Sequence, residues 1–351
     1  MTGHALTNPT TAVRPALHIA DHPVGPGYPT FVIAEAGVNH NGDRTLAAEL
    51  VAAAADAGAD AVKLQAFDPD GLCSRRHRAA ERDMLARYVL SEQDLADLHD
   101  RAKAAGLFFL VTPFGFEQVD VVVRLGAPAI KVGSGEVTHT PLLRSIGTRG
   151  LPVLLSTGAA ELRDVERAVK VLRSAGSREI ALLHCTSIYP APDESLNLRA
   201  ISTLSERFAD CVIGYSDHSV GITASIAAVA MGAALIEKHL TMNRSLNGPD
   251  HAASAEPDEL ARLVREIRRF EHMAGDGIKR PAGGEGVIGQ SLVAARDLHA
   301  GHVVTPGDLT FKRPGWGLRP YMLGQVMGRR LRRDLPAEEV LTRDHIDWGQ
   351  P

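Results

Sequence analysis

The fold is decided by the stretch GYSDHSVGITASIAAVAMGAALIEKHL, residues 214–240. A continuous apolar run at each end predicts a β-strand, and the alanine-rich segment between them predicts a helix. Continuous apolar strands are typical of a parallel sheet that is buried on both faces. Each predicted strand ends in a histidine, His218 or His239. The stretch therefore indicates a strand–helix–strand unit with one imidazole at the end of each strand.

The same unit recurs along the chain between residues 31 and 275. Eight apolar runs predict strands, and a segment with helical periodicity follows each one. The predicted strands cover residues 31–37, 61–67, 107–114, 129–136, 152–158, 180–187, 211–219 and 235–242. Eight such units over about 245 residues are typical of a TIM (β/α)8 barrel, an α/β fold, with an open doubly wound sheet as the alternative.

The sequence changes in character after residue 275. Residues 276–289 are rich in glycine and proline without periodicity, so they predict a linker. The linker joins a barrel unit with its lead-in, residues 1–275, to a second domain, residues 290–351. Short apolar runs broken by turn sequences indicate that this second domain is mostly β. A domain of about 60 residues buries proportionally little surface, so we expect it to pack on a larger unit.

Composition limits the classes of function. The chain has 351 residues, 44% of them hydrophobic, and a net charge of −4, which argues against a nucleic-acid partner. It contains no run of about 18 uncharged apolar residues that would predict a membrane span. Residues 1–30 lack the apolar core of a signal peptide, and the three cysteines show no CxxC spacing. We therefore expect a cytoplasmic protein that has no membrane partner.

Polar residues stand at the carboxyl end of every predicted strand. Enzymes with a TIM barrel place their catalytic groups at this end, whereas a purely structural barrel would have turn residues there. The candidates are Glu35, Lys63, Gln65, Thr112, Lys131, Ser134, Glu136, Ser156, His184, Ser187, Tyr189, Ser216, His218 and His239. The lysines and hydroxyl groups suit an anionic substrate. Either lysine could instead form an ion pair with Glu35 or Glu136, or act as a Schiff-base nucleophile.

The two histidines suggest a metal site. His218 and His239 end neighbouring predicted strands, so their imidazoles can meet at one divalent ion that keeps positions open for water and substrate. Either histidine alone would more often be a structural residue. Imidazole combined with oxygen ligands can accept Mn²⁺, Mg²⁺ or Co²⁺. Glu35 and Glu136 are the candidates for acid–base catalysis, because a carboxylate near a metal-bound water can transfer protons.

Short motifs throughout the chain resemble the sialic acid synthase family. In sequence order they are IAEAGVNHNGD, VKLQ, TPF, KVGSGE, STG, LLHCTSIYP, YSDHS, EKHLT and GPDHAAS. The C-terminal segment resembles the SAF domain of that family, which is also called antifreeze-like. The resemblance extends from about residue 17 to residue 347 and supports both the barrel and the small second domain.

The resemblance implies a reaction and a cofactor. Members of the family condense phosphoenolpyruvate with an open-chain N-acylated hexosamine, such as N-acetylmannosamine or a 2,4-diacetamido sugar. The products are a nonulosonic acid and phosphate, and the resemblance favours Mn²⁺ as the metal. The sequence departs from the family pattern at Asn243 and Ala255, which leaves the acceptor sugar open. A relative that uses a different aldehyde sugar, a Schiff-base aldolase and a catalytically inactive binding module remain alternatives.

The resemblance also implies roles for individual residues. It places His184 close to the phosphate, although a structural role is the alternative. Gln65, Tyr189 and Asp250 are candidates for the hydroxyl groups of the sugar. Family members form domain-swapped homodimers, and Arg313 stands where the second domain contributes an arginine to the N-acyl group of the sugar.

Overall fold

The computed structural model describes residues 16–280 and 288–349. These residues form two compact units, with the division between Gly275 and Asp276. The predicted linker, residues 276–289, lies partly outside the described residues. Each unit is described separately below.

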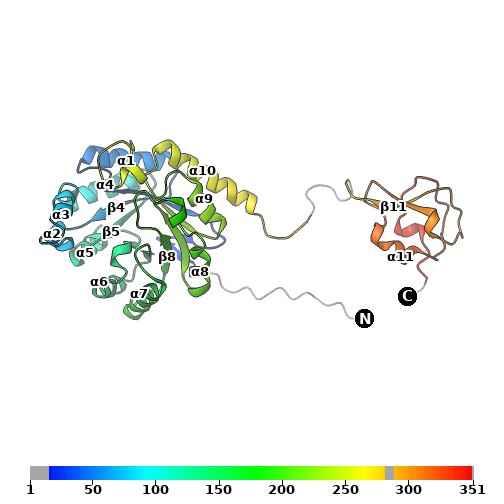
Figure 1. Cartoon of the computed structure of the whole chain (residues 1–351), viewed down its shortest axis with the longest axis horizontal. Coiled ribbons are helices and arrows are strands. Elements are labelled where there is room, and N and C mark those ends of the chain that lie inside the picture. Colours follow the sequence, from blue (N-terminus) through cyan, green and yellow to red (C-terminus); the bar gives the residue numbers. More distant parts are fainter. Residues whose placement is uncertain (1–15, 281–287, 350–351) are drawn as a thin grey trace. The chain divides into compact units, whose positions relative to one another are not determined.

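Eight parallel strands form a closed barrel in the first unit (Figure 1). The strands are β3 (Phe31–Gly37), β4 (Ala61–Ala66), β5 (Phe108–Pro113), β6 (Ile130–Val132), β7 (Val153–Ser156), β8 (Ile180–Cys185), β9 (Val212–Asp217) and β10 (Leu235–His239). Each strand pairs with the next, and β10 pairs with β3 to close the circle. The barrel predicted from the sequence is therefore confirmed.

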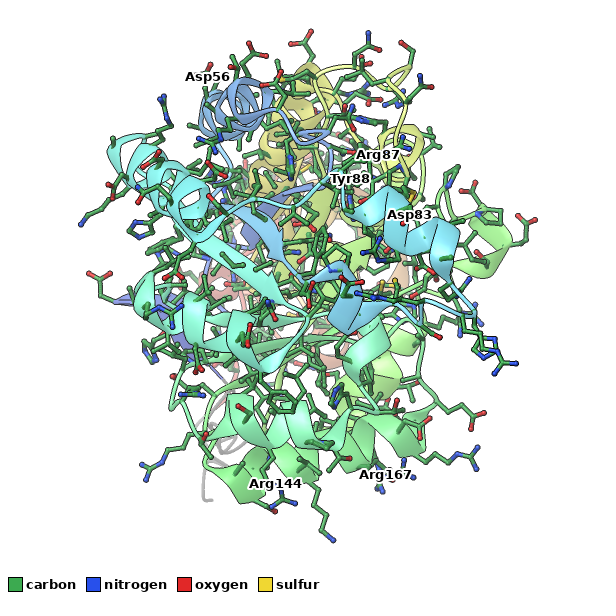
Figure 2. The ribbon with its side chains drawn as sticks, turned by 90° about the vertical axis from the view of Figure 1, so that its left-hand side faces the viewer. Asp56, Asp83, Arg87, Tyr88, Arg144 and Arg167 are labelled. Carbon is green, nitrogen blue, oxygen red and sulfur yellow. The ribbon has the colours of Figure 1, made fainter. Side chains whose placement is uncertain are left out.

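Helices surround the strands, as Figure 1 shows. They are α1 (Arg44–Asp56), α4 (Glu92–Ala104), α5 (Phe116–Arg124), α6 (Thr140–Gly147), α7 (Leu162–Ala175), α8 (Ala200–Arg207), α9 (Thr223–Ala230) and α10 (Pro257–Ala274). Their apolar faces pack on the barrel, while charged side chains such as Arg144 and Arg167 project outward (Figure 2). Ser91 caps α4 by accepting a hydrogen bond from the amide of Asp94, as its residue type predicts.

Side chains alternate along each strand between the barrel interior and the helix layer. In β10, for example, Leu235 belongs to the apolar cluster inside the barrel, whereas Ile236 belongs to the cluster between strands and helices. The carboxyl end of the interior is polar and the amino end is apolar. This alternation decides which residues of a strand can reach the pocket described below.

A hairpin that the sequence did not predict covers the amino end of the barrel. It consists of β1 (Leu17–Ile19) and β2 (His22–Val24), where only a turn-rich lead-in was expected. Leu17, Ile19 and Val24 are fully buried and share a cluster with Phe31 and Leu183 of the barrel interior. The hairpin therefore extends the core and leaves the carboxyl end as the open end.

Between β4 and α4 the chain forms two short helices, α2 (Pro69–Leu72) and α3 (Ala79–Leu85). The Asp70 carboxylate accepts hydrogen bonds from Arg75 and Arg82, at 2.9 and 2.6 Å, and so joins the two helices. The guanidinium groups hold the pKa of Asp70 well below its usual value. This segment contributes one wall of the pocket.

The second unit is small and has its own core. It contains the antiparallel strands β11 (Ser291–Ala294) and β12 (Leu309–Lys312) and one short helix, α11 (Leu323–Val326). Leu292, Val326 and Leu335 are fully buried in it. The architecture confirms the prediction of a small, mostly β domain. Among the described residues of both units, no helix is long and apolar enough to cross a membrane.

Candidate active site at the carboxyl end of the barrel

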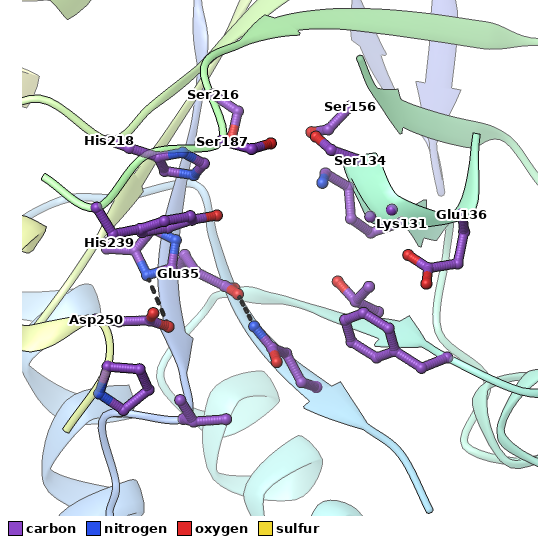
Figure 3. A pocket seen from close by; sticks show the side chains of 18 of the residues that line it. Glu35, Lys131, Ser134, Glu136, Ser156, Ser187, Ser216, His218, His239 and Asp250 are labelled. Carbon is purple, nitrogen blue, oxygen red and sulfur yellow. Dashed lines mark hydrogen bonds and ion pairs between the residues drawn. The ribbon is translucent and has the colours of Figure 1, made fainter. Parts of the chain in front are cut away.

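A pocket of about 790 Å³ opens at the carboxyl end of the barrel, and each of the eight strands contributes a side chain to it (Figure 3). The strand residues are Glu35, Lys63, Gln65, Thr112, Lys131, Ser156, Cys185, Ser216, Glu237 and His239. The loops that follow the strands add Ser134, Glu136, Ser187, Tyr189, His218 and Asp250. The structure thus brings together every residue of the predicted site except His184 and Arg313.

Two lysines and two glutamates form a buried charge network in the pocket. The Nζ atom of Lys63 lies 2.7 Å from Oε2 of Glu35 and 3.7 Å from Oε2 of Glu237. The Nζ atom of Lys131 lies 3.5 Å from Oε1 of Glu237. All four side chains are almost fully buried. The ion pair between Lys63 and Glu35, which the sequence left as an alternative, is therefore present inside the pocket.

Burial and charge act in opposite directions on these four groups. Burial raises the pKa of Glu35, and the charge of Glu237 raises it further, against the effect of Lys63. At Glu237 the two lysines outweigh burial and lower the pKa. Burial lowers the pKa of Lys131, whereas the two carboxylates outweigh burial at Lys63 and raise its pKa. Glu35 is therefore the carboxyl group of this network that can most readily hold a proton.

Hydroxyl groups stand around the lysines. Thr112 Oγ1 accepts a hydrogen bond from Lys63 Nζ at 3.0 Å, and Ser216 donates one to Glu237 at 3.0 Å. The Ser156 hydroxyl is buried and has no hydrogen-bond partner among the described residues. An anion bound here could accept hydrogen bonds from both the lysines and this free hydroxyl.

Glu136 lies at the opposite side of the pocket from the histidines (Figure 3). It ends a short 3-10 turn, Ser134–Glu136, instead of the strand that the sequence predicted to reach residue 136. Burial raises its pKa to about 7. A group with this pKa can both accept and donate a proton near neutral pH, as acid–base catalysis requires.

The rings of His218 and His239 lie edge to face, with their centroids 5.2 Å apart. The Nδ1 atom of His218 donates a hydrogen bond to the Thr186 carbonyl oxygen at 2.7 Å, which leaves Nε2 with a free lone pair. The Nδ1 atom of His239 is buried and lies 3.5 Å from Oδ2 of Asp250, beyond a good hydrogen bond. Burial lowers the pKa of both rings, that of His218 to about 4.

The histidine pair has the chemical form that a metal ligand needs, because only a neutral imidazole binds a metal ion. Within the part of the chain that the structure describes, no group of three or more His, Cys, Asp or Glu side chains is arranged to hold an ion. The pair alone therefore fits a site in which water and substrate oxygens supply the other ligands.

One residue of the predicted barrel site, His184, lies outside the pocket. His184 points away from the barrel interior, donates a hydrogen bond from Nε2 to the Leu196 carbonyl at 2.7 Å and stacks on Tyr215. The reason is the alternation of β8, in which Cys185 points inward and its neighbour His184 outward. His184 borders a separate cavity of about 350 Å³ next to α7 and α8. Arg313 belongs to the second unit, and its role stays a prediction.

Among the strand residues that line the pocket, the sequence reasoning assigned no role to two, Glu237 and Cys185; the lining residues of the α2–α3 segment, such as Arg78 and Glu81, were not predicted either. Neither Glu237 nor Cys185 is among the candidates that the sequence analysis named. The Cys185 sulfur lies 3.6 Å from Nδ1 of His218. Glu237 is two residues before His239, and Cys185 is two residues before Ser187. Each therefore points to the same side of the barrel wall as that predicted site residue, and this alternation was the signal that could have identified them.

Comparison with known proteins relates the two units to characterised families. Residues 50–279 match the NeuB family and residues 289–347 match the SAF domain. The chain is 40% identical to the N,N'-diacetyllegionaminic acid synthase of Legionella pneumophila, with 93% of this chain and 97% of that protein covered. It is 31% identical to the N-acetylneuraminate-9-phosphate synthase of Homo sapiens, with 92% and 94% covered.

A solved structure is similar to this chain over most of its length. The N-acetylneuraminic acid synthetase of Leptospira borgpetersenii serovar Hardjo-bovis has a TM-score of 0.73 and 35% identity. The comparison covers 77% of this chain and 93% of that one. These matches confirm the resemblance that the sequence motifs indicated. The chain belongs to the NeuB family of acid synthases and carries a C-terminal SAF domain.

Proposed function

We propose that the chain condenses phosphoenolpyruvate with the open-chain form of an N-acylated amino sugar and releases a nonulosonic acid and phosphate. Its relatives include synthases of N,N'-diacetyllegionaminic acid, N-acetylneuraminate 9-phosphate and pseudaminic acid. The acceptor is N-acetylmannosamine or a related 2,4-diacetamido sugar. An acceptor of the 2,4-diacetamido type is favoured because a legionaminic acid synthase is among the more similar relatives.

The observation that carries the proposal is that a cation with hydroxyl groups and a pair of neutral imidazoles line opposite sides of one pocket. Lys131, Ser134 and Ser156 lie on one side, and His218 and His239 lie on the other (Figure 3). Phosphoenolpyruvate has a phosphate and a carboxylate, which need cations and hydrogen-bond donors such as those of the first side. An uncharged sugar aldehyde can then occupy the side of the histidines, next to the enol carbon.

A divalent ion held by His218 and His239, Mn²⁺ in preference to Mg²⁺ or Co²⁺, would polarise the aldehyde oxygen of the sugar when bound. The protein groups orient the reactants and handle protons around it. Glu237 holds Lys63 and Lys131 at the anion side. Glu35, whose pKa burial raises, is placed to hold the proton that an alkoxide product needs. Glu136 is the candidate base for the water that adds to C2, before phosphate leaves with cleavage of the C–O bond.

The outer part of the pocket would bind the acceptor. Gln65 donates a hydrogen bond from Nε2 to Glu35 at 3.0 Å, so its carbonyl oxygen remains available for a sugar hydroxyl. Tyr189 stacks on His218 with a centroid distance of 4.0 Å and presents its phenol to the pocket. Asp250 borders the same region beside His239. We further propose that a homodimer forms, in which Arg313 of one chain contacts the N-acyl group bound in the barrel of the other.

Release of inorganic phosphate from phosphoenolpyruvate with a panel of sugars tests the proposal. The panel would hold N-acetylmannosamine, its 6-phosphate and a 2,4-diacetamido sugar, each with Mn²⁺. Turnover must depend on the sugar and yield one nonulosonic acid per phosphate. If no member of the panel supports phosphate release, the proposed function is wrong.

A Schiff-base aldolase is the second candidate, because burial lowers the pKa of Lys131 and so favours its free amine. Borohydride reduction during turnover distinguishes the two mechanisms. Mass spectrometry would find substrate attached to Lys131 if an imine forms, whereas the proposed condensation leaves every lysine unmodified.

A further inference from the structure

The segment that follows β10 forms a loop whose two ends lie side by side. The amide of Thr241 donates a hydrogen bond to the Ala255 carbonyl at 3.0 Å. The amide of Ala255 in turn donates to the His239 carbonyl at 2.7 Å. Residues 242–254 therefore leave the barrel and return to it at the same place. This loop carries Asp250 into the pocket.

His251 links this loop to the rest of the barrel mouth. Its Nδ1 atom lies 2.7 Å from Oγ1 of Thr241, and its Nε2 atom lies 3.2 Å from Oδ1 of Asn41. The residue is 1% exposed and does not border the pocket. A Cβ atom on Gly248 would lie 2.6 Å from Cδ2 of the imidazole, so the loop packs directly on the ring.

A neutral ring in one tautomer satisfies both contacts. Because Oδ1 of Asn41 is an acceptor, Nε2 carries the proton in this tautomer. Oγ1 of Thr241 lies 2.7 Å from Nδ1 and 3.1 Å from the Asn243 carbonyl oxygen, so its proton is directed to the closer acceptor, Nδ1. Burial lowers the pKa of His251, which keeps the ring neutral. Asn41 follows β3 and Thr241 follows β10, the two strands that close the barrel. The imidazole therefore joins the loops of two paired strands.

The neighbouring residue, Asp250, is held from both sides. Its carbonyl oxygen accepts a hydrogen bond from Ser254 Oγ at 2.7 Å, and Asn39 Nδ2 donates to the same Oγ at 2.8 Å. Its carboxylate faces His239 across 3.5 Å (Figure 3). The contacts of Ser254 with Asp250, and those of the adjacent His251 with Thr241 and Asn41, together hold the backbone that carries the Asp250 carboxylate.

We infer that His251 is a positioning residue for the acceptor sugar, which fixes residues 241–255 so that the Asp250 carboxylate meets the sugar in the pocket. The inference rests on the proposed function. It assigns a role to a residue that touches neither substrate. Removing the hydrogen bonds of His251 should therefore weaken binding of the acceptor sugar, and phosphoenolpyruvate binding at the lysines should be unaffected.

A double-mutant cycle tests this inference. His251→Phe keeps an aromatic ring but removes both hydrogen bonds, and it should raise KM for the acceptor by about tenfold. KM for phosphoenolpyruvate should stay within about twofold of the wild-type value. In the Asp250→Asn background the same change should cost little more, because His251 acts through Asp250. Calorimetric titration of the acceptor sugar would report the same coupling without turnover.

Milder variants guard against a general loss of folding. Thr241→Val removes the hydroxyl partner of His251, together with the bonds of that hydroxyl to the Asn243 backbone, and should give the same pattern on a smaller scale. His251→Gln, which keeps a donor for Asn41, should recover part of the affinity. Thr342→Val is the matched control, because Thr342 makes a similar bond to His345, at 2.8 Å, in the second unit. It should leave both KM values unchanged.

The outcomes separate the inference from the function on which it rests. If wild-type protein turns over but the losses in the two single variants multiply in the double variant, only the inference is wrong. The same holds if both KM values rise together in Thr241→Val. If wild-type protein releases no phosphate with any sugar, the proposed function is wrong and the inference with it.

Discussion

The charge of Glu136 makes stability depend on pH in a predictable direction. Its pKa is about 7 in the folded protein against an ordinary value of 4.5. Between these values the folded state binds the proton more tightly than the unfolded chain. This contribution to stability is complete below pH 4.5 and is lost as the pH rises through 7.

Glu136→Gln removes this titration because the amide stays neutral. As the pH rises from 5 to 8, the wild type loses this contribution and the variant does not. We therefore expect the free energy of unfolding of the variant to increase relative to that of the wild type. Urea unfolding of both proteins at the two pH values measures the change. An identical difference at pH 5 and pH 8 would show that Glu136 is not perturbed in this way.

The histidine pair gives a prediction about metal. Treatment with a chelator should abolish phosphate release, and Mn²⁺ should restore it, since His218 and His239 are the proposed ligands. His218→Ala should weaken Mn²⁺ binding, measured by equilibrium dialysis, and should reduce activity far more than it reduces thermal stability. Full activity in protein that is demonstrably free of metal would exclude this role.

At the scale of the element, the position of each strand was predictable from its apolar run, whereas the direction of a side chain could be predicted only by counting from another site residue on the same strand. The apolar runs fix the strands because a parallel sheet is buried on both faces. All residues of such a run are apolar, so they do not reveal which face looks into the barrel. His184 and Cys185 are adjacent, and the histidine was the chemically plausible choice. The structure shows the opposite orientation, with Cys185 in the pocket.

The same alternation separates two neighbouring charges on β10. Glu237 points into the pocket, whereas Lys238 lies outside the barrel strands, 3.2 Å from Oδ2 of Asp217. Both members of this pair are fully buried. Ser225 of α9 donates a hydrogen bond to the same carboxylate at 2.6 Å. The pair therefore joins β9, β10 and α9 and has a structural role.

Lys238→Met should strongly destabilise the protein, because it leaves the Asp217 carboxylate buried without a counter-charge. The expected loss is about 3–5 kcal/mol of unfolding free energy, measured by urea denaturation. The control is Arg124→Met, which breaks an exposed pair with Glu92 and should cost less than about 1 kcal/mol. Equal effects of the two variants would contradict the structural role of Lys238.

At the scale of the whole molecule, the order of the two domains followed from composition, but the packing of the N-terminal hairpin on the barrel did not. The hairpin β1–β2 has too few residues to show a period, and its apolar residues make sense only beneath a closed barrel. The position of Arg313 raises the same difficulty on a larger scale. Its proposed partner lies in another chain, and no local sequence pattern specifies such a contact.

A mixing experiment tests the proposed shared site. Arg313→Ala and His218→Ala chains should each have low activity as pure dimers. After subunit exchange, one composite site of each hybrid dimer would hold both wild-type residues, so some activity should return. Mixing two batches of the same variant provides the control. If mass spectrometry confirms hybrid dimers and activity stays low, each SAF domain serves its own barrel.

The closure of the barrel between β10 and β3 has a consequence for the synthesis of the protein in the cell. His239 lies in register with Glu35, and the amide of Leu240 donates a hydrogen bond to the Glu35 carbonyl at 2.8 Å. The ribosome makes β3 first among the barrel strands and β10 last. These two neighbours in the site are therefore synthesised at the beginning and at the end of barrel synthesis. A nascent or prematurely terminated chain that lacks β10 has neither His239 nor Glu237. Under the proposed roles of these residues, such a fragment has no activity, and catalysis starts only after the last strand has left the ribosome and closed the circle.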